Sequence, residues 1–479
     1  MEPDDELYTP FLEPLLSRPN TTLVPKTGII WKDLNDVLCP KYLPHQTERP
    51  RDETPTRNDT LLVTANLSFY PKKSFRGFDS VADLVLYQFI SAIRTSSIFQ
   101  KYGLVRILIW TGDDEKLAIL PRSVQRRKRS AIEAEISTEW ITEIAGAEPD
   151  DQQVWFVRDR AIDLESAQNV ADKMAKSGLK IPPGRETNLL KDLRSRGKDA
   201  PTTAGKQAAV FERPYVNELR ALEEESSTKG FASGTPKDER LRYLRYLLRW
   251  NSKRNNVIMD LLKEREAIAK LKPRAAAERK EKQTREAAWN DKVNELNKDL
   301  QLQFLLARDN LHIFQQDPPV LNWDRRAMEP LVVKNTEFFP NVPSALLDIQ
   351  PKPMHPLIRA TGPGTSHSGD VFELVLRSLL QASKSPVSKV LESLAPGASE
   401  GVFPNCPALQ DPARGGSRLG GHAEVSPRAL NEQQLIEILE AWMAWPFAPS
   451  YAELVGRTVD DPGDQGADEE GNKLGQVDF

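Results

Sequence analysis

The clearest structural signal in the chain is the stretch Leu61-Leu62-Val63-Thr64-Ala65-Asn66-Leu67-Ser68-Phe69. Its first five residues form an apolar run of the length of a buried strand, and residues 105–110 form a second such run. Residues 81–98 between them carry apolar side chains at helical spacing. Strand, helix and strand in this order predict an α/β fold with a parallel sheet and right-handed crossovers.

Asn66 and Phe69 are candidate base-holding residues because they stand where the first predicted strand ends. In open α/β sheets, this carboxyl end faces the ligand crevice. An enzyme that methylates the exocyclic nitrogen of adenine needs an amide oxygen to accept an N6 hydrogen and an aromatic ring to stack on the extruded base. The alternative is local: an Asn at a strand end commonly bonds its own backbone, and a Phe commonly packs in the core.

A short basic cluster follows the second predicted strand and contains no acid. Its members are Arg122, Arg126, Arg127, Lys128 and Arg129. A charge run of this kind is commonly solvated, but its place near the sheet edge that carries Asn66 favours a phosphate contact. Such contacts position a nucleic-acid backbone without reading its sequence and make binding steeply dependent on salt.

The middle of the chain, from about residue 151 to 320, has the character of long polar helices. Residues 237–300 hold 18 Lys and Arg against 11 Asp and Glu. Two readings stay open, a solvated helical face with i,i+4 ion pairs and an arm that contacts nucleic-acid phosphates. Pro273 predicts a kink in the first helix or its end. A packing stripe along that helix is predicted at Leu244, Leu248, Val257, Leu261, Ile268 and Leu271.

The later segments predict a return to the sheet followed by a helical lobe. Residues 345–349 have strand length, and residues 371–394 and 428–454 show helical patterns. Residues 395–427 between them are rich in Gly and Pro. After about residue 458 the chain becomes acidic, so we expect a disordered tail.

Composition excludes several classes of protein. The chain has 479 residues and a net charge of −4, which hides the uneven distribution of its bases. Its two cysteines, Cys39 and Cys406, form neither a disulfide framework nor a zinc-binding pair, and the five histidines are scattered, so we predict no metal site and a reducing intracellular compartment. No apolar run is long enough to span a membrane, and the acidic start shows no targeting signal.

Several motifs in order resemble the rRNA adenine N6-dimethyltransferase family. The residues 66–69 resemble the family's Asn-Leu-Pro-Tyr or Asn-Leu-Pro-Phe motif, with Ser68 where proline is usual. The further matches are the strand at 105–110, the helix and proline at 117–121, the basic turn at 127–130 and the element at 338–345.

The later half is similar to fungal mitochondrial transcription initiation factors derived from that family. The runs that carry this likeness are Trp323-Asp324-Arg325-Arg326-Ala327-Met328-Glu329-Pro330-Leu331, residues 337–340, residues 346–352 and Trp442-Met443-Ala444-Trp445-Pro446-Phe447. They carry no catalytic logic of their own, and aromatic and proline-rich corners also occur as simple packing. The resemblance covers roughly residues 1–160 and 321–456.

The resemblance implies a Rossmann-like class I methyltransferase sheet that lacks its first strand and glycine loop. It places Glu2 as the acid that binds the ribose of S-adenosylmethionine, but without the glycine turn we expect this chain not to bind that cofactor, and we expect upstream residues to be missing. The implied division is a core at 1–160, a basic helical insertion at 161–320, a return to the sheet at 321–360, a helical lobe at 361–457 and an acidic tail at 458–479.

Three functions follow as hypotheses. The first is a mitochondrial matrix initiation factor that binds promoter DNA and helps a mitochondrial RNA polymerase, with an unpaired base stacked on Phe69 for about 1–3 kcal/mol. The second is an active S-adenosylmethionine-dependent dimethyltransferase of small-subunit rRNA, in which Asn66 accepts the N6 hydrogen. The third is a non-enzymatic scaffold whose basic helices are the working surface.

Overall fold

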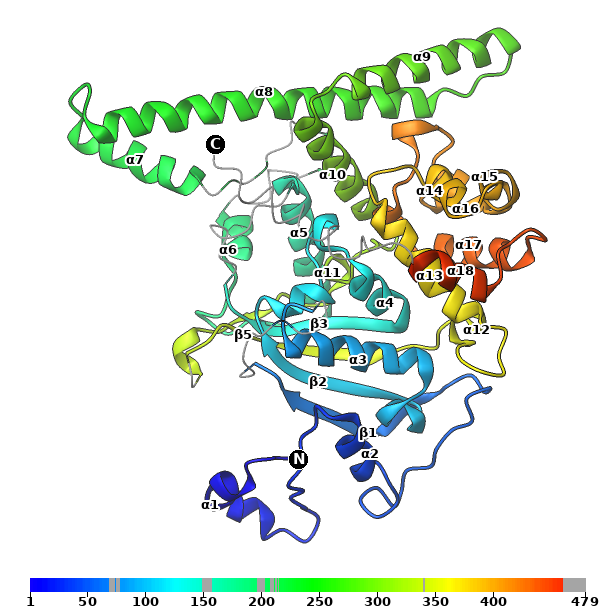
Figure 1. Ribbon diagram of the computed structural model, residues 1–479. Helices are drawn as coiled ribbons and strands as arrows, with labels where there is room; N and C mark the ends of the chain where they lie inside the picture. The colour runs from blue at the N-terminus through cyan, green and yellow to red at the C-terminus, as the bar shows by residue number, and fades with distance from the viewer. Residues whose placement is uncertain are drawn as a thin grey trace.

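The computed structural model of the chain describes residues 1–68, 74, 78–148, 157–195, 203–206, 211, 213, 215–338 and 341–459. It is a mixed α/β fold in which one five-stranded sheet lies under many helices (Figure 1). The strand order is β1-β2-β5-β3-β4. The strands are β1 Arg57–Asn66, β2 Leu104–Gly112, β3 Thr138–Gly146, β4 Leu331–Val332 and β5 Ser344–Pro351.

The sheet is mixed because one strand runs against its neighbours. β1 pairs with β2 in parallel, as the two apolar runs predicted, and the predicted strand near residue 345 rejoins the sheet as β5. β5 lies antiparallel between β2 and β3, and the short β4 pairs in parallel with β3. The expectation of a parallel sheet is therefore correct for the first pair and wrong for β5. β3 was not foreseen.

The two faces of the sheet differ in burial. On β2, Val105, Ile107 and Ile109 are completely buried, whereas Arg106 and Trp110 alternate with them on the other face and keep part of their surface exposed. Helix α3 (Val81–Thr95), which matches the predicted helix, packs on the buried face together with α4 (Arg129–Ser137). Removing such apolar side chains from water contributes about 1.5–3 kcal/mol each.

The basic middle forms a helical arm across the top of Figure 1. Its helices are α7 Tyr215–Lys229, α8 Pro236–Lys270, α9 Ala276–Asn294 and α10 Lys298–Phe314. The Thr235 hydroxyl caps α8 by accepting from the Asp238 N–H, and α8 ends just before Pro273, as predicted. In α9, the buried Trp289 anchors the helix by donating its indole N–H to the Leu261 carbonyl at 3.0 Å.

The predicted packing stripe of α8 is half correct. Of its six residues, Leu244, Leu261 and Ile268 are buried. The other three face outward and are exposed: Leu248, Val257 and Leu271. The buried positions advance instead through 241, 244, 247, 251, 254 and 258, in steps of three and four residues that keep them on one face of the helix.

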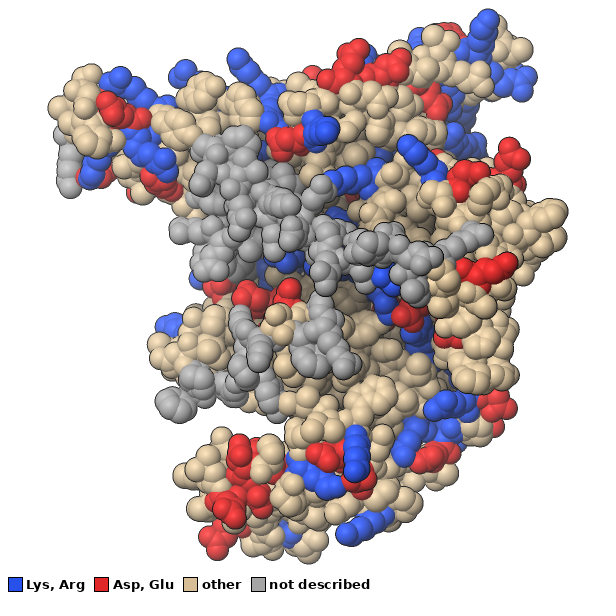
Figure 2. Space-filling model, in the orientation of Figure 1, with Lys and Arg blue, Asp and Glu red and all other residues tan. Residues whose placement is uncertain are grey.

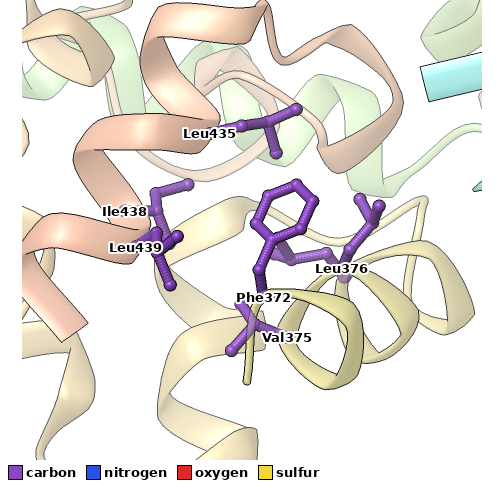
Figure 3. Close-up of a pocket in the computed structure, with 7 residues that line it drawn as sticks. Phe372, Val375, Leu376, Leu435, Ile438 and Leu439 are labelled. Carbon is purple, nitrogen blue, oxygen red and sulfur yellow. The ribbon is translucent and has the colours of Figure 1, made fainter. Parts of the chain in front are cut away.

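The C-terminal lobe packs on the same hydrophobic core as the sheet. Its helices are α12 Pro356–Arg359, α13 Ser368–Gln381, α14 Val387–Leu394, α15 Ala398–Gly401, α16 Pro407–Gln410, α17 Glu432–Ala444 and α18 Tyr451–Val459. Figure 3 shows Phe372, Val375 and Leu376 of α13 facing Leu435 and Ile438 of α17. The hole between them measures about 10 Å³ and has no room for a ligand.

The remaining helices connect these parts. They are α1 Asp5–Leu16, α2 Trp31–Val37, α5 Arg160–Ser177, α6 Asn188–Ser195 and α11 Asn322–Arg325. Single 3₁₀ turns are η1 Ile98–Tyr102, η2 Glu115–Ala118, η3 Val124–Arg126, η4 Asn335–Glu337, η5 Phe403–Asn405, η6 Pro412–Arg414, η7 Gly421–Ala423 and η8 Pro427–Ala429. Within the described residues no helix is both long and apolar enough to cross a membrane. Apart from its first two residues, which lie at the end of α18, the predicted acidic tail falls outside the described residues.

Candidate nucleic-acid interface

Asn66 ends β1 at the carboxyl edge of the sheet, and its side chain is exposed. The Asn66 Oδ1 accepts two hydrogen bonds from Ser68, one from the backbone N–H at 3.1 Å and one from the hydroxyl at 2.6 Å. This is the local turn that Asn commonly makes at a strand end. Phe69, the other predicted base-holding residue, lies outside the described residues.

Two aromatic rings lie next to Asn66 in the fold. Asn66 is in register with Trp110 on β2, and the Leu67 N–H donates to the Trp110 carbonyl at 2.7 Å. The Trp110 ring meets Phe338 edge-to-face, with centroids 5.3 Å apart. Both rings are half-buried. The sequence prediction named neither Trp110 nor Phe338 as a site residue, although both belong to segments that carried the resemblance.

A four-membered ionic cluster lies at the same carboxyl edge. Lys116 donates to Asp113 and to Glu143, each at 2.6 Å, and Arg122 donates to the second Glu143 oxygen at 3.4 Å. Lys116 and Glu143 are almost fully buried. Two acids balance two bases, so this edge is rigid and close to neutral. Sequence reasoning missed the cluster because Lys116 and Glu143 are far apart in the chain.

Arg127 corrects the prediction for the basic cluster. Its guanidinium is 1% exposed and binds both Glu135 oxygens, the shortest contact being 2.6 Å, while Nη1 donates to the Arg428 carbonyl at 2.7 Å. A side chain enclosed in this way cannot reach a phosphate. Arg127 instead stabilises the junction between α4 and the C-terminal lobe.

Arg129 has a similar internal role. It donates to Glu133 at 3.0 Å and to Glu373 of α13 at 2.5 Å, and it also bonds the Tyr87 hydroxyl. Burial lowers the pKa of Arg129, but the two carboxylates and Tyr87 outweigh it and raise the pKa overall.

The other three members of the cluster are partly exposed, as Arg129 is. Arg122, which binds Glu143, also lies over the Trp323 ring at 4.0 Å, and Arg126 and Lys128 are half-buried. Only part of the predicted phosphate-binding cluster therefore faces solvent.

The helical arm carries many exposed bases. Several of its bases form i,i+4 ion pairs, for example Arg242 with Asp238 and Arg285 with Glu281, as the solvated-face reading expects, and others pair with acids of α7. A second group is exposed and makes no ion pair with any described residue: Arg249, Lys253, Lys263, Lys272, Arg274, Arg279 and Lys280. Figure 2 shows blue Lys and Arg side chains along this arm, with red acids between them. The paired bases fit the solvated-face reading, and the unpaired bases leave the phosphate-contact reading open.

An exposed tyrosine lies within the unpaired bases. Tyr246 is 61% exposed, and Arg249 and Lys253 follow it at i+3 and i+7, which places the three side chains on one face of α8. An exposed aromatic ring beside exposed cations is a combination with which proteins can bind single-stranded nucleic acid. We call this set, Tyr246, Arg249 and Lys253, the arm face.

Glu2, the acid predicted to bind the ribose of the cofactor, does not lie where such a residue is expected. Glu2 precedes α1 and is not at the end of a strand; its carboxylate accepts the Asp4 N–H at 3.1 Å. Across the described ranges no group of three His, Cys, Asp or Glu side chains could hold a metal ion. Within the described part of the chain, Glu2 therefore does not stand at the end of a strand, which is where a ribose-binding acid is expected.

Comparison of the chain with protein-family models, with characterised proteins and with solved structures finds no match. Its family membership stays a prediction from the motifs.

Proposed function

We propose that this chain is a nucleic-acid-binding factor of the mitochondrial transcription initiation type, which binds promoter DNA and assists a mitochondrial RNA polymerase. The observation that carries the proposal is the arm face, where Tyr246 stands among cations that have no carboxylate partner in the described part of the chain. Cations left unpaired on a protein surface are available to phosphates, and binding releases the condensed counterions of DNA.

The first strand pair supports the proposed ancestry. β1 and β2 are parallel neighbours, as the two apolar runs predicted, while β5 lies antiparallel between β2 and β3. The expected residues for a target base then lie at the carboxyl end of β1, where Asn66 stands.

Ser68 supports a non-enzymatic role. It donates both its N–H and its hydroxyl to Asn66 Oδ1, so both acceptor directions of that oxygen are occupied. Proline, which is usual at this position in the family, has neither donor. An adenine N6 hydrogen would have to displace these bonds before Asn66 could accept it.

A second candidate function is methyl transfer to adenines of small-subunit rRNA with S-adenosylmethionine as donor. The observation that favours it is the position of Asn66 beside the Trp110 and Phe338 rings, which supplies an amide next to an aromatic surface. It requires that the Asn66–Ser68 turn opens and that a cofactor site forms.

Promoter-dependent transcription separates the two. The full chain is added to a mitochondrial RNA polymerase on a promoter template that carries 2-aminopurine near the start site. We expect a rise in fluorescence and in run-off product, and a loss of both when Arg249, Lys253 and Lys263 are changed together to Gln. The matched control changes Arg240, Arg242 and Arg245, which are paired, and we expect it to retain most of the activity.

The contradicting result is equally clear. Saturable binding of labelled S-adenosylmethionine with methyl transfer to rRNA, and no effect on promoter opening, would replace the first function by the second.

A further inference from the structure

A cavity lies away from the predicted base-holding edge, between β3 and the α11 segment. Its volume is about 410 Å³, which is within the range of small-molecule sites. Its apolar wall is formed by Trp140 and Ile144 of β3, by Leu179 after α5 and by Met328 after α11. Asn322 and Arg325 of α11 line the cavity as well.

Three buried hydrogen-bond donors on this lining have no partner within the described part of the chain. They are the Asn322 Nδ2, the Arg325 Nε and the Arg326 Nε. The Asn322 and Arg326 side chains are each 3% exposed. A buried donor without an acceptor costs about 1–3 kcal/mol. These three nitrogens are enclosed, so an acceptor in the cavity meets the outer polar atoms of the same side chains, on a wall that has more donors than acceptors.

One of the cations that line the cavity, Arg325, forms no ion pair with a described residue. Arg326 is paired with Glu329 at 2.5 Å. Arg325 binds the Val320 carbonyl and forms no ion pair with the described residues. Burial lowers the pKa of Arg325, and Arg127 adds to this, whereas the carboxylates of Glu135, Glu432 and Asp324 offset it in part without forming an ion pair.

The acids that line the cavity do not cancel that charge. Asp348 is already neutralised by a bidentate bond from Arg106, with both contacts at 2.7 Å, and it accepts the Trp140 indole N–H at 3.3 Å. Glu139 is exposed to solvent. Lys173, on the far side of the segment, donates to the Arg325 carbonyl and adds positive charge.

We propose that this cavity binds a small organic anion with a flat apolar body. Its carboxylate or phosphate lies against Arg325 and Asn322, and its ring lies along Trp140, Leu179 and Met328. The site is independent of the proposed nucleic-acid function, because it uses none of the residues of the arm face.

Calorimetric titration of the full chain tests the proposal with matched pairs of probes. AMP is compared with adenosine, and indole-3-acetate with indole-3-acetamide. We expect at least one anion to bind with a Kd below about 1 mM and about tenfold more tightly than its neutral counterpart. Preference for AMP assigns a phosphate ligand, and preference for indole-3-acetate assigns a carboxylate ligand.

Variants distinguish binding from a purely structural role. Arg325→Met lowers the affinity for the anion about tenfold, leaves the neutral compound unchanged and does not lower Tm, because it removes an unpaired buried charge. Arg274→Met, at an exposed base of the arm, is the control and binds as the parent does. If Arg325→Met fails to fold, Leu179→Trp replaces it as the test variant. Leu179 is 45% exposed, and we expect the larger side chain to fill the cavity and abolish binding.

Three results overturn the proposal. The first is no binding of either anion at about 1 mM, and the second is equal binding of the anion and its neutral counterpart. The third is unchanged anion binding in a folded Arg325→Met variant or, where that variant does not fold, in Leu179→Trp.

Discussion

The two basic regions of this protein use their charges in opposite ways. Residues 122–129 have the higher local density of bases, yet Arg127 buries its guanidinium against Glu135, and the partly exposed Arg129 pairs with Glu133 and Glu373. The arm is more dilute in charge, yet its outer side keeps bases such as Arg249 and Lys253 exposed and unpaired among the described residues. Position in the fold, and not charge density, decides whether a base is available to a ligand.

The reason lies in what surrounds each segment. The 122–129 cluster connects the sheet to α4 and is enclosed by α3 and α13, so its bases meet acids from three elements. α8 is supported on one side only, by α7, α9 and α10, and its other side meets solvent. A protein surface that must contact a long polyanion is built more readily on the second kind of element.

The largest expected effect is on the buried pair. Arg127→Met leaves the Glu135 carboxylate buried without its partner, and we expect the free energy of unfolding to fall by about 3–5 kcal/mol. Urea denaturation measures the change. Arg126→Met is the half-buried neighbour and should shift stability by about 0.5 kcal/mol or less. Equal losses of unfolding free energy in the two variants would show that the buried and the half-buried bases of the cluster do not differ in their contribution to stability.

The inner side of the arm gives the next largest effect, through pH. Burial, with help from Arg265 of α8, lowers the pKa of His312 to about 4, and the His312 Nε2 is 3.0 Å from the Gly415 carbonyl. The unfolded chain binds a proton below about pH 6.5 that the folded chain takes up only near pH 4. Stability is therefore full above pH 6.5 and is lost as the pH falls, by about 3 kcal/mol at pH 4.

Denaturation of the parent and of His312→Gln at pH 7 and pH 4 measures this contribution. We expect the parent to lose about 3 kcal/mol more than the variant. Identical losses in the parent and the variant would show that His312 does not contribute to the pH dependence of stability.

The outer side of the arm gives an effect on binding and not on stability. Tyr246→Ala should weaken single-stranded DNA binding by about 1–3 kcal/mol, because a base loses its stacking ring, and should change duplex binding less. Tyr243→Ala is the comparison variant, because Tyr243 lies three residues earlier on the same side of α8, is less exposed and stands beside Arg240 at 5.8 Å. Fluorescence anisotropy with both kinds of DNA measures the difference. A stronger effect of Tyr243→Ala would move the stacking site toward the start of α8.

The smallest expected effect comes from comparing two Arg–Glu pairs that differ in their burial. Arg245 and Glu223 form an Arg–Glu pair like that of Arg127 and Glu135, at 3.0 Å, but both side chains are about half exposed. Arg245→Gln should cost less than about 1 kcal/mol of stability, because water screens the pair. A loss as large as that of Arg127→Met would contradict the account of burial.

Regular patterns were readable from the sequence. The apolar runs of β1 and β2, the helix α3 and the end of α8 before Pro273 all follow from short-range periodicity and from proline chemistry. β3 was missed because Glu139 and Glu143 interrupt its apolar residues and because it follows α4 directly, with Thr138 as both the helix cap and the first strand residue.

The site was less readable, because its contacts join distant segments. Nothing near Arg127 in the sequence shows that its guanidinium meets the Arg428 carbonyl, and nothing near Lys116 points to Glu143. The local bond between Asn66 and Ser68 was within reach, since it spans two residues, and it stood as the alternative reading. The cavity beside Arg325 combines four segments, and no sequence pattern indicated it.

The salt dependence of nucleic-acid binding tests the central claim most directly. We compare single-stranded oligonucleotide affinity between about 50 and 200 mM salt for the full chain, for Arg249→Gln/Lys253→Gln/Lys263→Gln and for Arg122→Gln/Arg126→Gln/Lys128→Gln. The account predicts that the arm variant reduces the slope of log affinity against log salt by about 2, and that the cluster variant changes it much less. An unchanged slope in the arm variant, or an equal reduction in both, would contradict it.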